Sequence, residues 1–154
     1  MKILQRLIAV LAVLLLAPNA LAAANIGVSN AWIPQAPPGV GMLAGYLTIT
    51  NAGDTSVNLL AAQSDRFRSV TVHQTVIENG VSRMRELHLL EMAPGKEITF
   101  APGGMHLMLM QPRTPVVPGE RIAITLLLSD GQRVPAMFDV QAASTDDQPP
   151  DHHH

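Results

Sequence analysis

The chain has 154 residues, enough for one domain with a hydrophobic core, and its 12 acidic and 10 basic side chains give a formal charge of −2. A mildly acidic protein is a poor partner for nucleic acid or anionic lipid, so we expect neither as a ligand. The absence of cysteine excludes disulfides, cysteine-ligated zinc and the blue-copper electron-transfer site, which requires a thiolate.

The first 22 residues have the pattern of a secretory signal peptide. Lys2 and Arg6 form a positive region, an apolar run follows at 7–17, and small residues allow cleavage after Ala22 or as late as Ala24. The alternative is a membrane anchor, but the apolar run falls short of the about 20 residues that span a bilayer. We therefore expect an exported, periplasmic protein that has no membrane span once the signal peptide is removed.

The rest of the chain consists of short β-prone runs separated by turns, with turn signals about every 8–12 residues, as in β-sandwiches and barrels. Asn79-Gly80 marks a tight hairpin, because both residues tolerate the positive φ that such turns need. The expected strands cover residues 26–33, 42–51, 57–63, 69–77, 82–90, 97–100, 105–110, 121–128 and 133–140. This pattern predicts one all-β domain over 25–141 and a disordered, polar, proline-rich tail over 142–154.

One of these runs, 105–110, combines a histidine with three methionines. Side chains two apart on a strand share a face, so His106, Met108 and Met110 would lie on one face of the sheet. An imidazole and a thioether side by side form half of a site for a soft metal ion such as Cu(I). The alternative is a core strand, in which methionine fills space and the histidine is hydrogen-bonded.

The Asn79-Gly80 hairpin adds a second histidine and a second methionine to this candidate site. It brings His73 and Met84 onto neighbouring strands, which lie about 5 Å apart. Two neutral imidazoles and two thioethers suit Cu(I) better than Zn(II), which takes nitrogen, thiolate or carboxylate ligands. A zinc site formed by His73, His88 and His106 is an alternative, although we expect His88 to be a structural or surface residue.

The spacing His73-x10-Met84-x21-His106-x-Met108 is the signature of the periplasmic copper chaperone family PCu(A)C, which this sequence resembles from Ala31 to Val140. The surrounding residues also resemble that family, namely Ala31-Trp32, Ala44-Gly45-Tyr46-Leu47, Asn79-Gly80 and Pro102-Gly103-Gly104. The resemblance implies a cupredoxin-like or immunoglobulin-like Greek-key β-sandwich or barrel. It also implies that His73, Met84, His106 and Met108 bind one Cu(I).

The function implied by the resemblance is that of a non-enzymatic chaperone, which we expect to be a monomer. Its partner would be a copper-accepting protein, either cytochrome c oxidase subunit II with its copper A centre or a Sco-type thiol chaperone. Hydrolase or transferase chemistry has little support, because the sequence has no nucleophile-elbow serine and no glycine-rich phosphate loop.

Two other functions fit the same residues. One is a periplasmic copper scavenging or resistance protein without a dedicated client, and the other is an immunoglobulin-like interaction module whose histidines and methionines are only core. The sequence ends in His152, His153 and His154, which are either a native tail or a short purification tag. As a native tail they would bind Cu(II) weakly, since imidazole suits that ion.

Overall fold

The computed structural model describes residues 25–37 and 39–142, and every regular element in that part of the chain is a β-strand. The expected signal peptide lies outside the described residues, and so does the expected tail beyond residue 142, including its histidines. The described residues include no helix long and apolar enough to cross a membrane.

The strands follow the expected runs closely. They are β1 (Ile26–Pro34), β2 (Met42–Asn51), β3 (Val57–Gln63), β4 (Phe67–Glu78), β5 (Val81–Leu87), β6 (Leu90–Met92), β7 (Glu97–Phe100), β8 (Met105–Pro112), β9 (Arg121–Leu128) and β10 (Arg133–Gln141). The expectation of one strand over 82–90 is wrong, because the chain leaves β5 after Leu87 and begins β6 at Leu90. The reason lies on the edge of β4. β5 pairs with that edge as far as Val72, but β3 occupies it at Val70.

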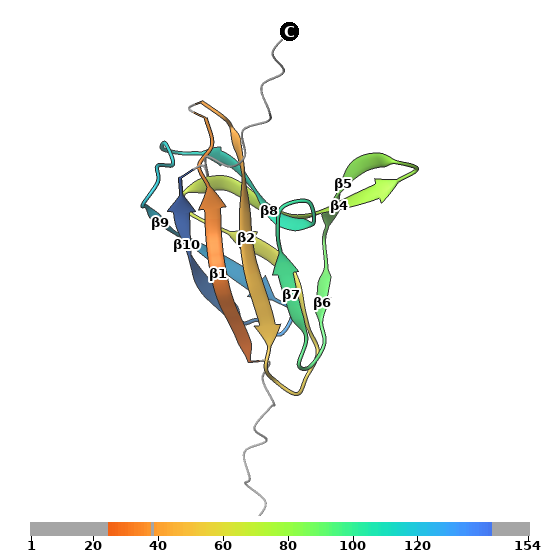
Figure 1. Ribbon diagram of the computed structural model, residues 1–154. Coiled ribbons are helices and arrows are strands. Elements are labelled where there is room, and N and C mark those ends of the chain that lie inside the picture. Colours follow the sequence, from red (N-terminus) through yellow and green to blue (C-terminus); the bar gives the residue numbers. More distant parts are fainter. Residues whose placement is uncertain (1–24, 38, 143–154) are drawn as a thin grey trace, which may run out of the picture.

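Seven of the strands form a closed barrel (Figure 1), which confirms the expected all-β, cupredoxin-like architecture. Their order is β4-β8-β2-β1-β10-β9-β3, and the pairing of β3 with β4 closes the circle. The pairing of β1 with β10 is parallel, whereas the other described pairings are antiparallel. The three remaining strands extend the barrel at β4, β2 and β3, where β5, β7 and β6 respectively are hydrogen-bonded.

The barrel interior is filled by alternate side chains of these strands, with Phe67, Phe100 and Phe138 among the largest. On β8 the inward residues are Leu107 and Leu109, which are completely buried. Because successive side chains of a strand point to opposite faces, the even-numbered residues of β8 lie on the outside of the barrel. The sequence predicted that His106, Met108 and Met110 share a face, and the structure places that face on the outside of the barrel.

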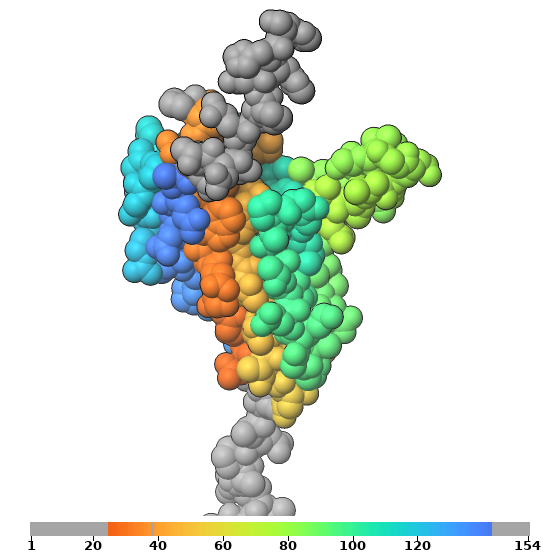
Figure 2. Space-filling view, in the orientation of Figure 1, coloured from red at the N-terminus to blue at the C-terminus, as the bar shows by residue number. Residues whose placement is uncertain are grey.

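The β4–β5 hairpin stands out from the barrel in Figure 2 and turns at Asn79 and Gly80, both of which have positive φ. These angles, 53° and 77°, are those that a two-residue hairpin turn demands. Arg83 and Arg85 both form ion pairs with Glu78 on one face of the hairpin. The opposite face of the hairpin carries His73 and Met84. It continues the outer face of β8 away from the barrel.

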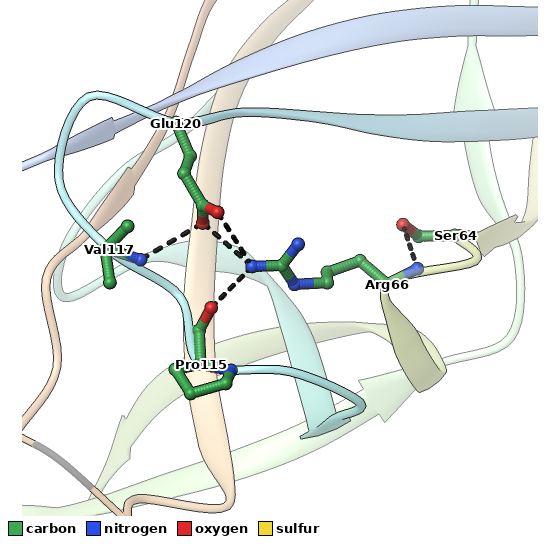
Figure 3. Close-up of polar contacts among 5 residues, drawn as sticks. All are labelled: Ser64, Arg66, Pro115, Val117 and Glu120. Carbon is green, nitrogen blue, oxygen red and sulfur yellow. Dashed lines mark hydrogen bonds and ion pairs between the residues drawn. The ribbon is translucent and has the colours of Figure 1, made fainter.

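Arg66, in the turn between β3 and β4, anchors the loop that joins β8 to β9 (Figure 3). Its Nη2 donates hydrogen bonds to Glu120 Oε2 at 2.8 Å and to the carbonyl oxygen of Pro115. The backbone N–H of Val117 donates to the same carboxylate at 3.1 Å. The Val117 hydrogen bond and, after it, the Arg66 guanidinium lower the pKa of Glu120, although burial opposes them. The ionised carboxylate is thus the form that holds the loop.

We expect Arg66→Met to destabilise the fold by on the order of 1–2 kcal/mol, because it removes hydrogen bonds between charged or half-buried groups. Arg121→Met is the matched control, since the ion pair of Arg121 with Asp139 is exposed and should contribute less than about 0.5 kcal/mol. Urea unfolding at neutral pH measures both. Equal losses in the two variants would show that the loop is not anchored in this way.

The stabilisation by Glu120 should also depend on pH, with a sign that follows from its lowered pKa. A carboxylate with a lower pKa in the folded state stabilises the fold above its unfolded pKa. This contribution is lost as the pH falls through the folded pKa. The difference in the free energy of unfolding between the parent and Arg66→Met should therefore be smaller in acid than at neutral pH.

Candidate metal centre

The two histidines that the motif contains lie directly opposite each other on neighbouring barrel strands. His73 of β4 is the register partner of His106 of β8, and their ring centroids are 5.9 Å apart with an angle of 27° between the planes. His106 is only 8% exposed, and the side chain of His73 is 14% exposed. The barrel wall thus presents two facing, largely buried imidazoles on its outer side.

Each imidazole has one nitrogen that makes a hydrogen bond and one that has no partner among residues 25–37 and 39–142. His73 Nε2 shares a hydrogen bond of 2.9 Å with Thr71 Oγ1, while its Nδ1 is buried without a partner. His106 Nδ1 donates to the carbonyl oxygen of Gly104 at 3.4 Å, which leaves the lone pair on Nε2. A hydrogen bond that fixes one ring nitrogen while the other stays open is the usual arrangement of a metal-binding histidine.

The surroundings of His73 also favour its neutral form. Burial lowers the pKa of His73, and the neighbouring His106 lowers it further. The carboxylate of Glu86, whose Oε2 lies 4.0 Å from His73 Nε2, opposes both effects. A ring that stays neutral to lower pH is a better ligand, because a protonated nitrogen has no lone pair for a metal.

The two methionines of the motif lie on the same face as the imidazoles. Met108 is the register partner of Thr71, which lies two residues before His73 on β4. Met84 is the register partner of Thr75, which lies two residues after His73. Met84, His106 and Met108 line one shallow depression of about 290 Å³, and His73 adjoins it through its pairing with His106. Met84 is 52% exposed and is the outermost of the four side chains.

The alternative zinc site is contradicted by the structure. The side chain of His88 is 84% exposed and lies against Glu86, with Nδ1 and Oε1 3.5 Å apart. Over residues 25–37 and 39–142, no three histidine, aspartate or glutamate side chains are grouped so that they could hold a metal ion. The prediction that His88 is a surface residue is confirmed.

Besides the motif residues, six residues that were not predicted as ligands line the depression: Met42, Leu43, Ala44, Tyr46, Thr75 and Gly103. Tyr46 packs against Trp32, with ring centroids 4.9 Å apart, and burial raises its pKa. Met42 and Tyr46 lie on one face of β2, because they are an even number of residues apart on the strand. The pairing of β2 with β8 could not be derived from the sequence, because it joins segments about 65 residues apart.

Comparison with known proteins agrees with this architecture. The family model described as "Putative lipoprotein LpqE-like" matches residues 26–140. A relative in Leifsonia xyli, "Putative lipoprotein Lxx21020", is 34% identical over 118 residues, which cover 76% of this chain and 70% of that protein. "Uncharacterized protein RP573" of Rickettsia prowazekii is 30% identical over 86 residues, or 55% of this chain and 48% of that protein.

Solved structures with a similar fold include copper-binding domains. The copper-bound PCuAC domain from PmoF2 has a TM-score of 0.65 at 23% identity, and the match covers 79% of this chain and 97% of that domain. The solution structure of Cu(I)-bound DR1885 from Deinococcus radiodurans has a TM-score of 0.59 at 28% identity, and the match covers 80% and 83% of the two chains.

Proposed function

The chain belongs to the LpqE-like family, and from that premise we propose that it is an exported, non-enzymatic copper chaperone that carries one Cu(I). The ligands that we assign are His73, Met84, His106 and Met108. Export to the periplasm is supported by the signal-peptide pattern at residues 1–22 and by the description of the family as a lipoprotein family.

The observation that carries this proposal is the pair of facing imidazoles on the same outer face as two thioethers. Each imidazole has one nitrogen without a hydrogen-bond partner among the described residues. Neutral nitrogen and thioether ligands match Cu(I), a soft monovalent ion, and they offer Zn(II) neither thiolate nor carboxylate. The Cu(I) bound to the DR1885 structure, at 28% identity, supports the same choice of ion.

The arrangement also suggests how the ion is released. The two imidazoles are largely buried and would form the inner half of the site, whereas Met84 is half exposed on the projecting hairpin. A thiolate of the acceptor could approach from the Met84 side, bind the ion and displace this thioether first. Four neutral ligands leave the complex with its positive charge, so an anionic thiolate is electrostatically favoured as the next ligand.

For the acceptor we propose cytochrome c oxidase subunit II, at its copper A centre, or a Sco-type thiol chaperone. The second candidate function is copper scavenging without a client, which would use the same four ligands. Incubation of the Cu(I)-loaded chain with each apo acceptor distinguishes these functions. Transfer supports a chaperone, and retention of copper in the presence of both acceptors supports a scavenger.

The direct test of the site is an anaerobic Cu(I) titration in competition with a chromophoric chelator, repeated with Zn(II). We expect one tightly bound Cu(I) per chain and much weaker binding of Zn(II). Single-tryptophan fluorescence provides a second readout, because Trp32 contacts Tyr46 at the edge of the depression. A preference for Zn(II), or no binding of either ion, would contradict the proposal.

Cu(I) affinity should fall in acid, and the pH at which it falls should depend on the pKa of His73. Protons compete for imidazole nitrogen, so at the acid limit up to about two protons are displaced per copper. The lowered pKa of His73 means that its proton competes only below the ordinary histidine value of about 6.5. Cu(I) affinity measured from neutral pH into acid, beside a histidine NMR titration of the metal-free chain, tests this.

Glu86→Gln should shift this pH dependence in a direction that can be checked. The Glu86 carboxylate raises the pKa of His73, so its removal should lower that pKa further and shift the loss of affinity to lower pH. The effect should be small, because Glu86 is 42% exposed and its field is screened. A shift of the affinity curve to higher pH would contradict the assignment of His73 as a ligand whose charge Glu86 controls.

A further inference from the structure

Two more methionines lie on the outer face of the barrel beside the proposed site. Met42 of β2 and Met110 of β8 are register partners, and the next pair along the same face is Ala44 with Met108. Residues two apart on a strand share a face, so Met110 and Met42 follow directly on the face that presents Met108 and His106. Neither residue belongs to the four-ligand motif.

The position of Met42 distinguishes this pair from ordinary core filler. Met42 is the first residue of β2, where it pairs with Met110 of β8, and it is 48% exposed on the outer face of the barrel. It also lines the same depression as Met84, His106 and Met108. An apolar side chain that only stabilised the barrel would face inward, as Leu43 and Leu109 do.

The geometry of the pair permits two sulfurs to meet at one ion. Directly opposite residues of an antiparallel pair have Cβ atoms about 4.5–5.5 Å apart. Methionine has three rotatable side-chain bonds and adapts its sulfur position at little cost. Ala44, opposite Met108, is small and lines the depression together with Met42 and Met108.

We propose that Met42 and Met110 form a second, weaker binding position for a soft monovalent cation, from which the ion passes to Met108. This inference rests on the proposed function, since it places the second position at the entrance of the four-ligand site. Two thioethers without imidazole would bind Cu(I) or Ag(I) more weakly than the inner site does. They would also bind without competition from protons, because a thioether does not titrate.

The experiment is a titration of the full chain, labelled with ¹³C at the methionine methyl groups, with Ag(I) as a redox-stable soft cation and NMR detection. The first equivalent should shift the methyl signals of Met84 and Met108, and excess Ag(I) should then shift those of Met42 and Met110. Met137 is the internal control, because it is 44% exposed on β10 and should not respond. The second step should persist at a pH where the histidines are protonated.

The possible results separate the two proposals. If Met84 and Met108 respond but Met42 and Met110 stay unchanged in excess Ag(I), the second position does not exist and the four-ligand site stands. If Met84 and Met108 fail to respond to the first equivalent, the proposed function fails. An equal response of Met137 would show unspecific thioether binding and would also overturn the second position. Met42→Leu with Met110→Leu should abolish the second step and leave the first, whereas Met137→Leu should change neither.

Discussion

Replacement of Met108 by leucine is expected to weaken Cu(I) binding by at least about tenfold, since even the loss of an outer-shell partner of a metal ligand costs that much. The fold should be almost unaffected. Leucine and methionine have similar volumes, and a volume-conserving exchange costs on the order of 1 kcal/mol or less. Met137→Leu is the matched control, because it makes the same chemical change at an exposed position of β10.

His106→Ala should weaken Cu(I) binding too, but with a different dependence on pH. Loss of one imidazole removes one of the protons that compete with copper, so the acid-side slope should fall from about two protons per copper to about one. Met108→Leu should keep the full slope, since a thioether binds no proton. The measurement is Cu(I) affinity against pH for the parent and the two variants.

These two variants test two of the four assigned ligands, one of each chemical type. If Met108→Leu binds Cu(I) as tightly as the parent, the sulfur of this residue is not a ligand. If His106→Ala retains the parent slope, the imidazole that competes with protons is another one. Urea unfolding of each metal-free variant excludes loss of the fold as the cause of any weaker binding.

Local signals were sufficient to predict most of the strands. Apolar, β-prone runs between turn residues placed β2, β3, β7 and β9 with the bounds that the structure has. Asn79-Gly80 identified the hairpin, because few residue pairs accept two positive φ angles. The break between β5 and β6 was missed, since it depends on β3 taking the edge of β4 at Val70. No local pattern in residues 82–90 records that competition.

Closure of the barrel is likewise a long-range property. It depends on the parallel pairing of β1 with β10 and on one register contact, Ala62 with Val70. The sequence predicted a sandwich or a barrel without distinguishing them, because both show the same alternation within each strand. Only the order of the strands around the sheet separates the two.

For the candidate site, the sequence supplied the residue types and their faces, and the structure added their surroundings. The alternation on β8 placed His106 and Met108 on one face without any knowledge of β4. The facing of His73 and His106, and with it the contribution of His106 to the lowered pKa of His73, depends on the register between β4 and β8. The register between two strands that are separated by 32 residues of intervening chain, from His73 to His106, cannot be derived from either strand alone.

Leu107→Ala should give the opposite result to Met108→Leu, although the two residues are adjacent. Leu107 is completely buried in the barrel, and truncation of a buried leucine typically costs about 2–5 kcal/mol through lost burial and the cavity left behind. Cu(I) affinity should stay close to that of the parent, because the side chain of Leu107 points away from the face that presents His106 and Met108.

This expectation can be checked by urea unfolding and Cu(I) titration of the same Leu107→Ala preparation. Domains of this size have a free energy of unfolding of about 5–15 kcal/mol, so the variant should still be mostly folded at 25 °C. Cu(I) itself should restore part of the lost stability, since a ligand that binds only the folded state shifts unfolding by mass action. If Leu107→Ala instead loses Cu(I) affinity as strongly as Met108→Leu while it remains folded, the two faces of β8 are not independent. The ligand geometry would then depend on core packing beneath the imidazole, and not on the outer face alone.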